Sequence, residues 1–168
     1  MDAERNLLGW FNELAFAPVD LQPGAPADEW SGDRGVGCKY FSQDAVIRLA
    51  RPAGIRLPEA LTPAEKLLEV QDRMKQGHEG AAAIFRIIGT YLGHTLPLYA
   101  RLYDIDTVLV MGRVASGAGG DVLIDACNRV LREEYGPLAA GMTVMLPDEK
   151  ARRVGQSIAA ASLPERAG

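Results

Sequence analysis

The chain has 168 residues, of which 48% are hydrophobic and 24% charged, with a net charge of −4 and an isoelectric point near 5.2. This composition is typical of one globular domain, which we expect to span residues 1–168, and it excludes a disordered chain. No apolar run approaches the ~18 residues of a membrane span. The acidic balance argues against a nucleic-acid-binding protein, because such proteins usually carry a basic excess.

Cysteine and histidine are scarce. The chain has two cysteines, Cys38 and Cys127, and two histidines, His78 and His94, and none of the four lies at metal-ligand spacing from another. This argues against both a zinc site and a disulfide framework, and a reducing cytoplasm is the expected compartment.

In chain order, apolar periodicity and turn residues predict an alternation of helices, strands and loops. The expected elements are a short helix or turn leading into a strand at 14–19, a long loop at 22–37, helices at 42–50, 63–76 and 79–103, a strand at 107–111, a helix at 121–135, a strand at 142–146 and a final helix at 148–162.

Local signals support three of the helices. Ser42 is a candidate N-cap, and Thr62-Pro63-Ala64-Glu65 has the form of a capping box with proline at the first helical position. Within 79–103, Pro97 should kink or split the helix. Gly89 and Gly93 present a smooth face on that helix, either for close packing, including a homodimer contact, or as merely tolerated glycines.

The second half follows the order strand, glycine-rich turn, helix, strand, helix. Thr107–Met111 is an unbroken apolar and β-branched run, which predicts a strand buried on both faces of a parallel sheet. The order is that of an α/β fold with a right-handed crossover.

The glycine-rich turn at 112–120 is the candidate binding feature. A strand that ends in such a turn before a helix is where α/β folds bind ligands, because glycine permits close backbone approach and the helix offers free N–H groups. The spacing matches neither a dinucleotide fingerprint nor a P-loop, and Asp121 would repel a phosphate at the helix start. A ring and ribose lying against the turn, or a tight turn with no ligand, both remain open.

These residues resemble a known family. The stretch 91–120, YLGHTLPLYARLYDIDTVLVMGRVASGAGG, is similar to the ROK (repressor, ORF, kinase) group of sugar kinases in the actin-like, hexokinase-like ATPase superfamily. The resemblance implies the C-terminal lobe of an actin-like ATPase (ribonuclease H-like) fold, with a central sheet covered by helices on both faces. It also implies that Gly112, Arg113, Ser116 and Gly117 line the adenosine of ATP, with Arg113 standing where the family has a glycine. Gly155 would allow the closing helix to pack near the nucleotide.

The resemblance extends to the start of the chain. Asn12 to Phe16 matches the family's sugar-contacting GELGH motif, which implies that Glu13 hydrogen-bonds sugar hydroxyls. Phe16 stands where the family has a zinc-binding histidine. Residues 35–42 fall where the family has its cysteine-rich zinc motif, and only Cys38 is present there, so the resemblance implies that zinc is lost.

The match covers only the second half of a family member. The family's first half supplies the DxGxT phosphate loop and the aspartate that acts as general base, and neither is found in this sequence. The expected function is therefore the C-terminal lobe of an ATP-dependent sugar kinase-like protein, which binds ATP/Mg²⁺ and sugar with an N-terminal lobe or homodimer partner and is inactive alone. The alternative is a non-catalytic regulatory or oligomerisation module with a degenerate sugar or nucleotide site. No catalytic residue, nucleic-acid partner or membrane partner is expected.

Overall fold

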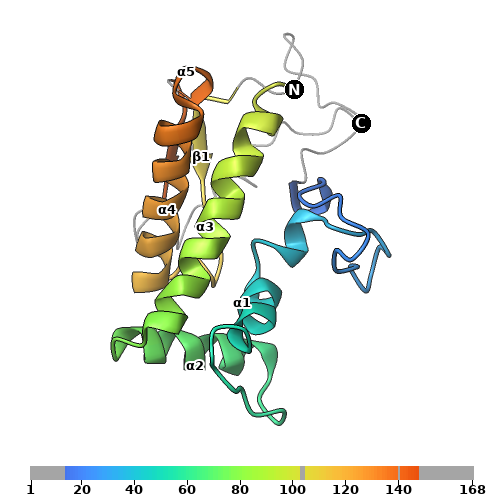
Figure 1. Cartoon of the computed structure of the whole chain (residues 1–168), viewed down its shortest axis with the longest axis vertical. Coiled ribbons are helices and arrows are strands. Elements are labelled where there is room, and N and C mark those ends of the chain that lie inside the picture. The colour runs from blue at the N-terminus through green and yellow to red at the C-terminus, as the bar shows by residue number, and fades with distance from the viewer. Residues whose placement is uncertain (1–13, 103–104, 140, 148–168) are drawn as a thin grey trace, which may run out of the picture.

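The computed structural model describes residues 14–102, 105–139 and 141–147. Within these ranges the chain is mostly helical, with a small two-stranded parallel sheet (Figure 1). The elements are the 3₁₀ helices η1 (Leu14–Phe16) and η2 (Gly37–Lys39), the helices α1 (Gln43–Ala50), α2 (Pro63–Lys75), α3 (Glu79–Tyr99), α4 (Ala118–Glu134) and α5 (Gly136–Ala139), and the strands β1 (Thr107–Leu109) and β2 (Thr143–Met145). The final helix expected at 148–162 lies outside the described residues.

The predicted helix starts of α1 and α2 are confirmed. The Ser42 hydroxyl accepts the Asp44 N–H at 3.1 Å. At α2 the Thr62 N–H donates to Glu65 Oε2 at 2.8 Å and the Glu65 N–H donates to Thr62 Oγ1 at 3.3 Å, which is a complete capping box. Both caps satisfy backbone N–H groups that a helix start leaves free.

Helix α3 ends earlier than predicted. It is continuous through Pro97, so the proline does not split it, and it ends at Tyr99 rather than at residue 103. Pro97 lies in the last turn, where its missing N–H removes only one hydrogen bond from a helix that is about to end. After the helix ends, the Ala100 N–H donates to the Leu96 carbonyl and the Leu102 N–H donates to the Tyr99 carbonyl.

Helices α3 and α4 lie side by side and run in the same direction (Figure 1). A Cβ added at Gly89 would lie 2.2 Å from the Leu123 carbonyl oxygen, and one at Gly93 would lie 2.8 Å from Val130 Cβ. The expected close-packing face is therefore real, and α4 of the same chain occupies it. This corrects the expectation of a homodimer through these glycines, because no second copy can reach them while α4 is in place.

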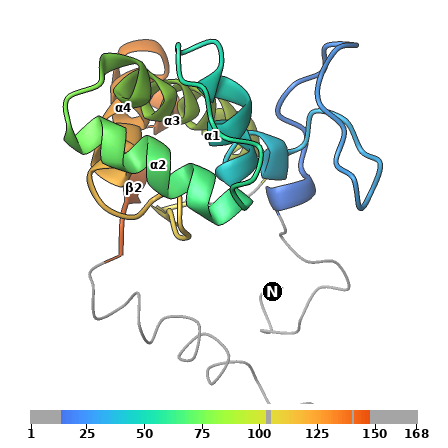
Figure 2. The same cartoon turned by 90° about the horizontal axis from the view of Figure 1, so that it is seen from below.

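The core lies between α3, α4 and the helices at one end of the pair. Phe85, Ile84 and Ile88 of α3 are fully buried, together with Val46 of α1 and Val70 of α2. Figure 2 shows α2 crossing the end of the α3–α4 pair beside α1. One side of the beginning of α4 is thus packed against the neighbouring helices.

The sheet is smaller and more open than predicted. Strands β1 and β2 pair in parallel with Val108 opposite Val144, and α4 connects them. Val144 is buried in the core, but on the other face Leu109 is 52% and Met145 44% exposed. The expected central sheet with helices on both faces, and a strand 107–111 buried on both sides, are not what the described residues form. The β-branched run indicated a strand correctly but could not tell a central strand from an edge strand.

Residues 22–37 form the expected long loop, and only Gly37 belongs to a named element, η2. Backbone bridges and side-chain hydrogen bonds hold this loop in place. Antiparallel bridges join Pro18 to Val36 and Ala27 to Arg34. The Asp28 side chain accepts the N–H groups of Trp30 and Ser31 at 3.1 and 2.8 Å, an Asx turn at the tip.

Candidate functional site

The glycine-rich turn connects β1 to α4. Gly112 has φ +109° and Gly117, the N-cap of α4, has φ +65°, and both values are strained for any residue with a side chain. Nothing lies within 4 Å of a Cβ placed on either glycine. The backbone at both ends of the turn is therefore open, so that a flat ligand can approach it closely.

The middle of the turn is held firmly. Val114 and Ala115 are buried, and the Ser116 hydroxyl donates to the Gly112 carbonyl at 3.2 Å. Gln71 of α2 donates through Nε2 to the carbonyls of Arg113 and Ser116, each at 3.2 Å. Gln71 clamps the turn from a helix more than forty residues away, and nothing in the sequence pattern singled it out.

Gly119 and Gly120 serve packing rather than binding. A Cβ on Gly119 would lie 2.6 Å from the Phe85 ring, and one on Gly120 would lie 2.2 Å from the Ala115 carbonyl oxygen. The first turn of α4 is thereby pressed against α3 and against its own preceding turn. This contact fixes where the open N-terminus of α4 lies.

Two clefts flank the turn. The first, of about 430 Å³, lies between Met111–Val114 and the segment Cys38–Asp44 that starts α1. The second, of about 200 Å³, lies between Ser116–Gly119 and α2, where Gln71 and Lys75 line it. The structure thus places predicted residues Gly112 and Arg113 on one side of the turn and Ser116 and Gly117 on the other. Glu13 and Gly155, also predicted site residues, lie outside the described residues.

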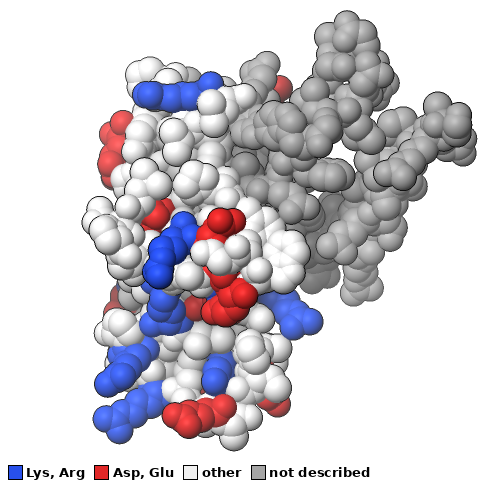
Figure 3. Space-filling model, turned by 90° about the vertical axis from the view of Figure 1, so that its right-hand side faces the viewer, with Lys and Arg blue, Asp and Glu red and all other residues white. Residues whose placement is uncertain are grey.

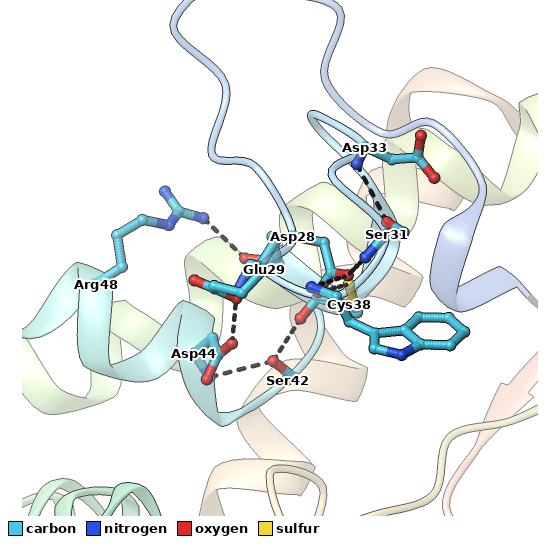
Figure 4. Close-up of polar contacts among 10 residues, drawn as sticks. Asp28, Glu29, Ser31, Asp33, Cys38, Ser42, Asp44 and Arg48 are labelled. Carbon is cyan, nitrogen blue, oxygen red and sulfur yellow. Dashed lines mark hydrogen bonds and ion pairs between the residues drawn. The ribbon is translucent and has the colours of Figure 1, made fainter.

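The Cys38–Asp44 segment, which lines the first cleft, also takes part in a polar junction between the 22–37 segment and α1 (Figure 4). At its centre Lys39, only 6% exposed, forms ion pairs with Glu29 and with Asp44, the latter at 2.9 Å. The Glu29 contact is the main cause that raises the Lys39 pKa, and it lowers the pKa of Glu29. The ammonium therefore stays charged, which ties the segment to the first turn of α1.

Two more contacts complete this junction. The Tyr40 hydroxyl donates to Asp20 Oδ2 at 2.5 Å, and this bond lowers the Asp20 pKa. The Arg48 guanidinium lies 4.9 Å from the centre of the Tyr40 ring and donates to the Lys39 carbonyl at 3.1 Å. These groups hold the junction rigid, and all of them come from residues that the sequence left without a role.

The cysteines and histidines have local structural contacts. The Cys38 thiol donates to Asp28 Oδ1 at 3.4 Å, and burial in the core raises the pKa of Cys127 to about 12. His78 Nδ1 accepts the Ala81 N–H at the start of α3, and His94 Nδ1 lies 3.1 Å from the Tyr135 hydroxyl. Among the described residues, no three His, Cys, Asp or Glu side chains converge as a metal site would require.

Phe16 packs against an aromatic side chain. Its ring centre lies 5.6 Å from that of Trp30.

In the part of the chain that the structure covers, no helix is long and apolar enough to cross a membrane. No protein-family model, no curated protein and no solved structure matches this chain.

Proposed function

We propose that the chain is the C-terminal lobe of an ATP-dependent sugar kinase-like protein of the ROK type, supplying the turn that binds adenosine and part of the sugar site. We propose further that it does not transfer phosphate alone. One observation supports this most strongly: the 430 Å³ cleft sets the open turn at Gly112 against the Cys38–Asp44 segment. The turn resembles the family's adenosine-binding turn, and residues 38–42 fall where the family has its cysteine-rich zinc motif.

The turn suits an uncharged ring system. The exposed Gly112 backbone allows close approach, and the exposed Arg113 side chain lies on the same cleft, where a guanidinium stacks well on an adenine face. Ser42 and Gln43 of the opposite wall offer hydrogen bonds to hydroxyl groups. This chain would therefore bind and orient the base and sugar rather than act on the phosphates.

The phosphate chemistry needs groups from elsewhere. Among the residues lining the first cleft, Asp44 is the sole carboxylate, and its oxygen is already paired with Lys39. Phosphoryl transfer requires Mg²⁺ ligands, a phosphate cradle and a base for the attacking hydroxyl. None of these is assembled by the described residues, and a second lobe would have to bring them.

Strand β1 leaves an edge on which a second lobe could add. Asp106 O accepts from Thr143 and the Val110 N–H donates to Met145, so alternate residues bond to β2. The peptide groups of Thr107, Leu109 and Met111 face the opposite edge and make no backbone hydrogen bond within the described part of the chain. An apolar groove of about 410 Å³, lined by Val108–Met111, Ile88 and Leu92, runs beside this edge.

A nucleotide titration tests the proposal. We expect AMP, ADP and a non-hydrolysable ATP analogue to shift the amide resonances of residues 111–119 and 38–44 with similar affinity, because the base dominates binding. Gly112→Ala should abolish binding. Gly77→Ala is the matched control, because Gly77 also has a positive φ (+83°) and open space at its Cβ but lies on another surface. Retained binding in Gly112→Ala, or its loss in Gly77→Ala, would refute the assignment.

The second candidate is a non-catalytic regulatory or oligomerisation module, and the apolar groove beside β1 favours it. A module of this kind would bind a protein partner through the groove and leave the glycine turn empty. A coupled ADP-release assay on the isolated chain with a panel of hexoses should give no turnover under either proposal. Nucleotide shifts at the turn favour the kinase lobe, whereas concentration-dependent light scattering without nucleotide shifts favours the module.

A further inference from the structure

A broad depression of about 760 Å³ lies at the C-terminal end of α1, between the connection 51–57 and α2. Its charged lining consists of cations alone: Arg51, Arg56 and Lys66. The half-buried Ile47 and Leu57 provide an apolar surface between them. No carboxylate lines this pocket, although the chain as a whole is acidic.

The three cations are uncommitted in the described structure, since none of them forms an ion pair there. The nearest acidic side chains along α2 are each engaged elsewhere. Glu65 closes the capping box with Thr62. Glu69 pairs with Arg73 and Asp72 pairs with Lys75, both at 2.8–2.9 Å. Among the described residues, none of the three cations therefore has an acidic side chain within ion-pair distance, and the exposed Glu59 lies three residues from Arg56.

The C-terminal end of α1 carries a partial negative charge that would oppose an anion. The last carbonyls of α1, however, already accept backbone hydrogen bonds. The carbonyls of Leu49, Ala50 and Arg51 accept N–H groups from Ala53, Ile55 and Gly54 at 2.9–3.1 Å. Gly54 takes φ +78° to make this closure, and Ile55 inserts into the core with 1% exposure. Arg51 and Arg56 are thus held on either side of a fixed turn.

We propose that this pocket binds a small phosphate ester, with the phosphate between the cations and an apolar or ring-shaped body on Ile47 and Leu57. Arginine forks match phosphate oxygens in a bidentate way, and lysine adds a point charge. On the face drawn in Figure 3, basic side chains predominate toward the end of the molecule that carries α1 and α2.

The pocket is separate from the first cleft beside Gly112, where we propose that nucleotide binds. It lies at the other end of α1, which has 8 residues and is about 12 Å long. This inference therefore stands or falls independently of the proposed kinase-lobe function.

The probe is phenyl phosphate, compared with inorganic phosphate and phenol, in a titration followed by amide resonances. We expect saturable shifts centred on 47–57 and 66, with phenyl phosphate binding more tightly than either fragment. Arg56→Gln should weaken binding about five- to tenfold, the effect of losing one charged hydrogen bond at a partly exposed site. Arg132→Gln removes an exposed, unpaired arginine at the far end of α4 and should leave affinity within twofold.

Three results would overturn the proposal. Equal loss in Arg132→Gln and Arg56→Gln would mean general charge attraction. Inorganic phosphate binding as tightly as phenyl phosphate would remove the apolar part of the assignment. Absence of saturable shifts at 47–57, with both variants as stable as the parent in thermal unfolding, would mean that there is no site. Arg56 is exposed, so its substitution is not expected to prevent folding.

Discussion

The contact of α3 with α4 at Gly89 offers a direct test of the fold. Replacing Gly89 by Ala places a methyl group 2.2 Å from the Leu123 carbonyl oxygen and 2.9 Å from Ala126 Cβ. The first of these neighbours is backbone in the middle of α4, so it cannot rotate away as a flexible side chain could. The two helices would have to separate locally by on the order of 1 Å, and the well-packed core would have to follow.

The expected cost follows from two opposing effects. Overpacking of a dense core costs about 1–3 kcal/mol, whereas alanine gains up to about 1 kcal/mol over glycine in a helix interior. Because the clashing neighbour is backbone, the upper part of the overpacking range applies, about 2–3 kcal/mol. With the alanine gain subtracted, the net loss for Gly89→Ala is about 1–2 kcal/mol, or about 2–8 °C in Tm for a chain of this size. Gly136→Ala in α5 is the matched control, because nothing lies within 4 Å of its Cβ, and it should be neutral or slightly stabilising.

Thermal and urea unfolding followed by circular dichroism would measure both variants. We expect Gly89→Ala to be less stable than Gly136→Ala in both kinds of unfolding. If Gly89→Ala were as stable as the parent chain, α3 and α4 could not approach as closely as described, and the packing of the α4 N-terminus against Phe85 would lose its basis.

Two further predictions concern titratable groups. Burial holds the Cys127 pKa near 12, whereas the pKa of the half-buried Cys38 is raised less far, by partial burial and by Asp28. Iodoacetamide at pH 8 should therefore modify Cys38 before Cys127 in the native protein. Peptide mass spectrometry would show the order, and early modification of Cys127 would contradict this core. The Tyr40 hydroxyl lowers the Asp20 pKa below 3.8, so Asp20 stabilises the fold above that pH and loses the effect as the pH falls through its folded pKa. Asp20→Asn should therefore lower the urea midpoint at pH 7 and lower it less at pH 3, and an equal difference at both would refute the linkage.

Local signals in the sequence predicted the helices well. The capping box at Thr62 and Glu65 and the N-cap at Ser42 act within one turn, so the chemistry that fixes each helix start is visible in four consecutive residues. The close-packing face at Gly89 was also visible as a spacing of small residues. Which element covers that face was not, because the partner lies in α4, more than thirty residues further along the chain.

The sheet and the site show where such inference fails. The run at 107–111 indicates a strand whether one or both of its faces are buried, and the exposure of Leu109 depends on what lies beside it. At the turn, the glycine-rich run points to Gly112 and Gly117, and both take the positive φ that favours glycine. Gln71 and Lys39 were missed because their roles depend on contacts that only the folded chain brings together.

The turn and the fold are therefore coupled through a small set of contacts. Gln71 holds the turn from α2, Phe85 of α3 meets Gly119, and Gly89 sets how closely α3 and α4 approach. The open backbone at Gly112 is a consequence of this packing and not of the glycine alone, since the same residue in an unsupported loop would sample many conformations. Because the core already orders the turn, a ligand that binds there would not have to supply the conformational entropy of ordering it. Under this condition a backbone turn can bind a flat ring with few side-chain contacts.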